Sequence, residues 1–274
     1  MSQHPQLTEV APVRALSLWL AAIGFFMLAI GELLISWFPT AGGLEFTLQT
    51  VGPVLIAVGL LLEWRTHVTQ RGWGALVFFF IALLAYAAVW FPYAFAPDSL
   101  GTTTATHRGF FTQGIGFICA AIGTFMVMRR KEAQLKLPTN SHDRQIKATF
   151  MELLLIGLGC LINGFSWIWV AKEDTRMAEF FLPVLGCLMI LIAVVSAREI
   201  LNVQVGRPAA VFIILGVFVF TLHWALDALP TWVDQDWRQS MRVAGVAFGL
   251  GGVACVLAAG HKAKAASLRL ALWQ

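Results

Sequence analysis

Residues 20–38, LAAIGFFMLAIGELLISWF, decide the fold. They are apolar at consecutive positions, and a helix rising about 1.5 Å per residue over this length approaches the roughly 30 Å needed to cross a bilayer core. The stretch contains one carboxylate, Glu32. A weaker echo, residues 153–170, LLLIGLGCLINGFSWIWV, lies in the second half of the chain. The pair predicts a membrane-embedded protein built from two similar halves.

The composition extends this prediction to the whole chain. Of 274 residues, 58% are hydrophobic and only 12% are charged, whereas a soluble domain has about 25% charged residues. The basic residues lie between apolar runs, so the net charge of +4 does not indicate a nucleic-acid partner. The first apolar run is too long for a cleavable signal peptide and lacks a clear cleavage site, so we expect it to be the first span.

The sequence predicts an all-α, polytopic fold with eight transmembrane helices. A β-barrel would need alternating strands, and these runs are apolar on consecutive residues. Lipid cannot satisfy exposed backbone polar groups, which favours helices. The predicted spans are residues 16–38, 46–64, 73–95, 109–128, 148–171, 177–197, 209–229 and 241–260.

The charges of the connections predict the orientation. Fourteen of the 19 basic residues fall on one side of the predicted membrane, and five fall on the other. The side that holds more Lys and Arg is normally cytoplasmic. We therefore expect both termini in the cytoplasm and the protein in the cell membrane. The five basic residues on the outer side are Arg108, Lys172, Arg176, Arg238 and Arg242.

Recurring short patterns predict two tandem four-helix repeats. Ile23-Gly24 matches Ile156-Gly157 at an offset of 133 residues, and Pro53 matches Pro183 at an offset of 130 residues. Ala75 and Trp90 match Ala209 and Trp224, and Gly114 and Phe117 match Gly245 and Phe248. Four spans per repeat would place the halves parallel, about an axis along the membrane normal. The predicted organisation is a cytoplasmic segment at 1–13, the first repeat at 14–128, a basic cytoplasmic linker at 129–147, the second repeat at 148–261 and a cytoplasmic tail at 262–274.

A few polar residues inside the spans are the candidate site. Polar groups are expensive in hydrocarbon, so each needs a partner or a cavity. Glu32, Asn163 and His223 fall at a similar depth below the outer surface, which predicts a polar pocket open to that side. Glu32 and His223 are the candidates for proton exchange. The full set of candidate ligand-binding residues is Glu32, Trp90, Gln113, Asn163, His223, Trp224 and Asp227.

A purely structural interpretation of these residues competes with the pocket. Glu32 would bond a neighbouring backbone or hydroxyl group, and His223 would pair with Asp227 one helical turn away. Most tryptophans would form an aromatic belt at the outer interface, although Trp90 and Trp224 are deeper and could receive an apolar or flat ligand.

The sequence offers no candidate cofactor or metal site. The four cysteines lie singly inside apolar runs, without a CxxC pair. The plan of two four-helix units is similar in outline to that of the haem A synthases. However, a bis-histidine haem site needs two facing intramembrane imidazoles, and His223 is the one histidine inside a span, so we do not assign the chain to that family.

Three functions are consistent with these observations. The favoured one is a small-molecule transporter or ligand-binding membrane protein with an outward-facing polar pocket. The second is a non-catalytic membrane subunit or sensor that docks other membrane helices, from another protein or a second copy of the chain. The third is an enzyme acting on a lipid or quinone at the outer leaflet, which we favour less because no nucleophile or metal set completes a mechanism.

Overall fold

The structure is a computed structural model, and it describes residues 6–37, 43–63, 72–95, 103–135, 143–173, 181–227 and 237–271. Within these ranges the elements are all helices, which confirms the predicted all-α, multi-pass membrane class. The helices are α1 (Gln6–Trp37), α2 (Leu44–Leu62), α4 (Trp73–Phe95), α5 (Thr103–Leu135), α6 (Asp143–Glu173), α7 (Leu182–Ser196), α8 (Arg198–Val205), α9 (Arg207–Asp227) and α10 (Trp237–Ala271).

Seven of the described helices are long and apolar enough to cross a bilayer, and each coincides with a predicted span. The predicted sixth span, residues 177–197, differs. Its described part is the 15-residue helix α7, and residues 177–180 lie outside the described ranges. Helix α8 follows α7 at a bend of 66°. The structure therefore has seven candidate spans within the described residues, or eight if α7 and α8 together form one bent span.

The bend has a physical cause in the sequence of α8, REILNVQV. This segment begins with Arg198 and Glu199 and mixes polar with apolar residues, so it suits the membrane interface better than the hydrocarbon core. Gly206 then returns the chain into α9 with φ 88°, a left-handed backbone conformation that glycine adopts without a steric penalty.

The predicted basic linker, residues 129–147, is partly helical. Helix α5 continues to Leu135 and α6 begins at Asp143, so both helices extend past their spans into this segment. Pro138 and Asn140, two residue types that often interrupt helices, fall between these helices in the sequence and lie outside the described residues.

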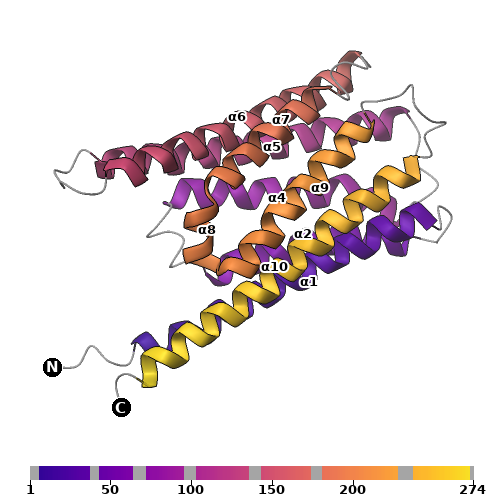
Figure 1. Ribbon diagram of the computed structural model, residues 1–274. Helices are drawn as coiled ribbons and strands as arrows, with labels where there is room; N and C mark the ends of the chain where they lie inside the picture. The colour runs from indigo at the N-terminus through magenta and orange to yellow at the C-terminus, as the bar shows by residue number, and fades with distance from the viewer. Residues whose placement is uncertain are drawn as a thin grey trace.

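Neighbouring helices pack in the same order in both halves of the chain (Figure 1). In the first half α1 packs on α2, α2 on α4 and α4 on α5, while in the second half α6 packs on α7, α7 on α9 and α9 on α10. The halves meet through two extensive contacts, α1 with α10 and α5 with α6. Figure 1 shows that α1 begins and α10 ends at the same end of the bundle. We call this the basic end, because Lys262 and Lys264 lie near it.

Paired glycines allow the closest helix crossings. A Cβ atom on Gly24 would lie 2.5 Å from the carbonyl oxygen of Gly52, and one on Gly159 would lie 2.5 Å from that of Gly186. The α1–α2 and α6–α7 contacts therefore use small residues so that the backbones can approach. Gly159 thus makes the same kind of crossing in the second half as Gly24 makes in the first. The sequence pattern instead matches Gly24 with Gly157, two residues earlier.

Candidate functional site

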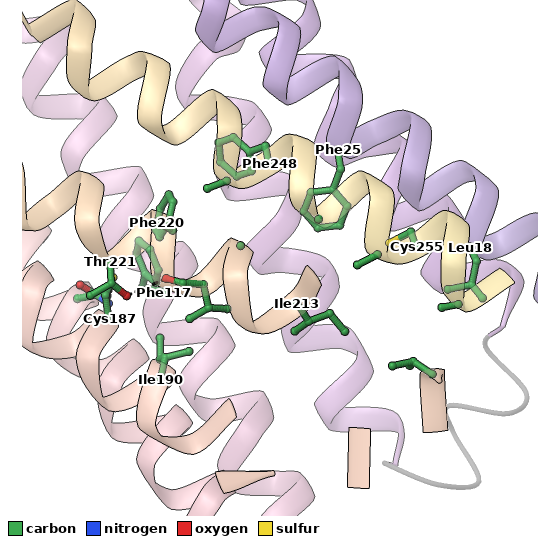
Figure 2. Close-up of a pocket in the computed structure, with 18 residues that line it drawn as sticks. Leu18, Phe25, Phe117, Cys187, Ile190, Ile213, Phe220, Thr221, Phe248 and Cys255 are labelled. Carbon is green, nitrogen blue, oxygen red and sulfur yellow. Dashed lines mark hydrogen bonds between the residues drawn. The ribbon is translucent and has the colours of Figure 1, made fainter. Parts of the chain in front are cut away.

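A cavity with a volume of about 430 Å³ lies between the helices of the bundle (Figure 2). Every described helix except α2 and α4 contributes to its lining. It runs from Leu18, Val205 and Ala258 near the basic end to Asn163 and Thr221 deeper in the bundle. The cavity is therefore an elongated space between the two halves, bounded mainly by the second.

The lining is almost entirely apolar. Phe25, Phe117, Phe220 and Phe248 provide aromatic walls, and small residues of α10 widen the space between them. Apart from the thiols of Cys187 and Cys255, the polar side chains on the lining are those of Asn163 and Thr221. A cavity of this kind has the size and character of a pocket for a small apolar ligand.

The two polar groups lie at the deep end and have local partners. The Thr221 hydroxyl donates to the Val217 carbonyl oxygen at 2.8 Å, and the hydroxyl oxygen can still accept a hydrogen bond. The Asn163 amide nitrogen lies 3.9 Å from the Cys187 sulfur, which is a weak acceptor. A ligand lying along the cavity would meet polar groups at this deep end.

Glu32 and His223 occupy different surroundings, and neither lines the cavity. Glu32 is buried in α1, where its carboxyl is reached by the Gln49 side chain from α2 and interacts with Tyr86 of α4. The His223 Nδ1 atom lies 2.5 Å from the Ser240 hydroxyl oxygen and 3.0 Å from the Ser240 carbonyl oxygen. The histidine thus joins α9 to α10, and its described hydrogen-bond partner differs from those of Glu32.

The two deep tryptophans also belong to different clusters. Trp90 stacks on Phe46 with ring centroids 5.9 Å apart and an interplanar angle of 16°. Trp224 meets Trp167 edge to face at 5.2 Å and lies 4.7 Å from the His223 ring. Neither tryptophan lines the cavity.

Of the remaining candidates, Asn163 lines the cavity and Gln113 is half-buried on α5 away from its lining. The side chain of Asp227 lies outside the described part of the structure, so its expected pairing with His223 is not described. Among the described candidates, Asn163 is the one on the cavity wall. This cavity therefore differs from the polar, outward-facing pocket that the sequence predicts, because its wall is apolar and it extends toward the basic end.

Several residues of these clusters escaped the sequence analysis as site residues. Gln49 and Tyr86 surround Glu32, and Ser240 bonds His223. The signal for Gln49 was present, because an amide inside an apolar span requires a partner. Tyr86 and Ser240 gave no such signal, since their roles depend on which helices meet.

Comparison of the chain with known protein families, with characterised proteins and with solved structures returns no match.

An ionic cluster lies near the basic end, next in sequence to Leu18 of the cavity lining. The Ser17 hydroxyl donates to Glu63 Oε1 at 2.6 Å, and Lys262 Nζ lies 3.9 Å from the same oxygen. These contacts connect α1, the C-terminal end of α2 and α10. Within the described residues, no group of three or more His, Cys, Asp or Glu side chains is arranged to hold a metal ion.

Proposed function

We propose that this chain is a ligand-binding protein of the cell membrane that holds one small lipophilic molecule in the cavity between its halves. The observation that carries the proposal is the cavity of about 430 Å³ with an almost wholly apolar lining. Ligand pockets for small molecules have volumes of about 300–1,000 Å³ and are lined mainly by hydrophobic and aromatic side chains. The membrane would supply such a ligand directly.

The lining also indicates the class of ligand. Asn163 and Thr221 at the deep end can bond one polar group, while the rest of the wall offers only apolar contact. The ligand we infer is therefore a mostly hydrocarbon or aromatic molecule with one polar end, such as a short isoprenoid or acyl compound. Transport of this molecule would require openings to both sides of the membrane. The geometry supports binding, and we propose only that.

The tandem organisation is part of the same proposal. The matching order of helix contacts in the two halves and the matching glycine crossings, Gly24 with Gly52 and Gly159 with Gly186, are what a duplicated four-helix unit would produce. The distribution of basic residues supports cytoplasmic placement of both ends. In this arrangement the cavity would extend from the cytoplasmic leaflet past the middle of the membrane, to the level of Asn163 and Thr221.

A binding assay with the full chain in lipid nanodiscs tests the proposal. An environment-sensitive, chain-like fluorescent probe would be titrated into wild-type protein and into a Val217→Trp variant, whose larger side chain occupies the cavity. We expect saturable binding to wild type and at least about tenfold weaker binding to the variant, a loss of about 1.4 kcal/mol. Leu215→Trp is the matched control, because Leu215 lies on the same helix, is 43% exposed and does not line the cavity. Equal binding by all three proteins would refute the proposal.

A further inference from the structure

The first half contains a buried acid that the proposed ligand site does not use. Glu32 is only 4% exposed and lies within the span Ala15–Trp37. Its side chain is enclosed by α2, α4 and α10: Gln49 and Tyr86 approach it from the first two, and a Cβ on Gly245 of α10 would lie 3.3 Å from the Glu32 Cβ. The carboxyl therefore lies in the interior of the bundle.

The Gln49 amide supplies one hydrogen bond to the Glu32 carboxyl, but other polar atoms of this cluster have no donor. The Gln49 amide nitrogen donates to the Leu28 carbonyl oxygen at 3.1 Å, which fixes the orientation of the amide. Within the described residues, Glu32 Oε2 and Gln49 Oε1 are both buried without a hydrogen-bond partner. Both atoms are acceptors when the carboxyl is ionised. Adding one proton to the carboxyl would turn one of these acceptors into a donor.

The charged and titratable groups near this acid do not neutralise it. Glu45 on α2 is another buried carboxyl group, and Tyr86 and Tyr93 on α4 are phenols, so none of the three is a cation. On α10, Arg242 is exposed, and no described ion pair involves Glu32. An ionised carboxylate inside a membrane normally pairs with a cation or lines a wet cavity. Glu32 takes part in no described ion pair and does not line the cavity described above.

We propose that Glu32 is a proton-binding site, held as a neutral carboxylic acid between α1, α2 and α4 and able to exchange its proton. The occupant is a proton rather than a metal cation, because the cluster around Glu32 has too few oxygen ligands. A calcium ion normally takes six to eight oxygen ligands, whereas the unpartnered buried oxygens described here are three: Glu32 Oε2, Gln49 Oε1 and Glu45 Oε2. This site is distinct from the ligand cavity, so either proposal can fail without the other.

Infrared difference spectroscopy of the full chain in nanodiscs tests the proton site. The carbonyl stretch of a protonated carboxyl group is resolved from carboxylate bands, and we expect it in wild type at neutral pH. Glu32→Gln, which keeps the shape of the side chain, should remove this band. Glu63→Gln is the matched control, because Glu63 is also buried but accepts from Ser17 and faces Lys262, and it should leave the band in place.

Two outcomes would overturn the proposal. A Glu32→Gln spectrum that loses a carboxylate band instead of the protonated-carboxyl band would mean that Glu32 is ionised. Disappearance of the wild-type band on adding sodium chloride at fixed pH, but not on adding choline chloride, would assign a cation site instead. A pH titration of the wild-type band gives an independent reading without any variant, and we expect the band to decrease as the pH is raised and to return when it is lowered.

Discussion

The rings of Tyr86 in α4 and Phe248 in α10 meet edge to face with centroids 6.5 Å apart, and they join the Glu32 cluster to the wall of the cavity. Tyr86 interacts electrostatically with Glu32, while Phe248 lines the cavity and its ring centroid lies 5.8 Å from that of Phe220. The contact also crosses between the two halves of the chain. A change in the cavity wall at Phe248 therefore acts directly on the surroundings of Glu32.

Replacing Phe248 by Ala should enlarge the cavity and destabilise the protein. Removing a fully buried aromatic ring costs about 3–5 kcal/mol, and because Phe248 is half-buried we expect a loss somewhat below this range. Denaturation of the purified variant in mixed micelles measures the loss. Phe248→Leu, which keeps most of the apolar contact, should lose less than half as much. A Phe248→Ala variant as stable as wild type would show that the ring is not part of the packed wall.

The glycine crossings predict matched effects in the two halves. Gly24→Ala and Gly159→Ala should each destabilise the protein by about 1–3 kcal/mol, because the added methyl group overlaps a backbone carbonyl oxygen of the adjacent helix. Gly260→Ala is the control, since a Cβ there meets nothing within 4 Å, and it should be neutral or stabilising by up to about 1 kcal/mol. Loss of stability for one of the two crossing glycines but not the other would count against the proposed duplication.

Cys255 is a natural reporter of the cavity. It is half-buried and lines the space, whereas Cys119 is buried and does not. An apolar maleimide should modify Cys255 faster than Cys119, as read by peptide mass spectrometry. Prior addition of a bound lipophilic ligand should slow the reaction at Cys255 by at least about tenfold, corresponding to a site that is more than 90% occupied. If a ligand known to bind does not change the rate at which the maleimide labels Cys255, that ligand binds elsewhere.

His223 and Ser240 should act as an energetic pair between α9 and α10. The close contact of the imidazole with both the hydroxyl and the carbonyl oxygen of Ser240 predicts a loss of about 1 kcal/mol for Ser240→Ala. A double-mutant cycle with His223→Ala should give a coupling energy of about 0.5–3 kcal/mol. Additive effects would show that the two side chains do not stabilise one another.

The sequence predicts the spans well and the helix contacts poorly, for a physical reason. Hydrocarbon requires long apolar helices, so seven predicted spans coincide with helices of the structure. The break after Ser196 was not predicted, because the apolar run of residues 177–197 gives no sign that the helix bends by 66° where it meets the more polar segment Arg198–Val205. Similarly, in apolar sequence Gly157 and Gly159 match Gly24 about equally well. The crossing with Gly186 distinguishes them, and it depends on a neighbouring helix.

For the polar residues, too, the sequence predicts which side chain is buried but not which residues surround it. A carboxylate at position 32 was predicted to be costly, and the structure buries it. Its neighbours Gln49 and Tyr86 come from two other helices, so no spacing along the chain could identify them. The apolar cavity was missed for a related reason: its wall is made of ordinary apolar residues such as Ile213 and Val217, and only their arrangement around an empty volume distinguishes them from lipid-facing ones.

The occupancy of the cavity is tested most directly by native mass spectrometry of the full chain released from membranes. We expect wild type to retain one lipophilic molecule per chain, and the Val217→Trp variant to lose that molecule while Leu215→Trp keeps it. Wild-type protein that carries no such molecule, and that takes up none from a lipid extract under the same conditions, would contradict the proposed binding function.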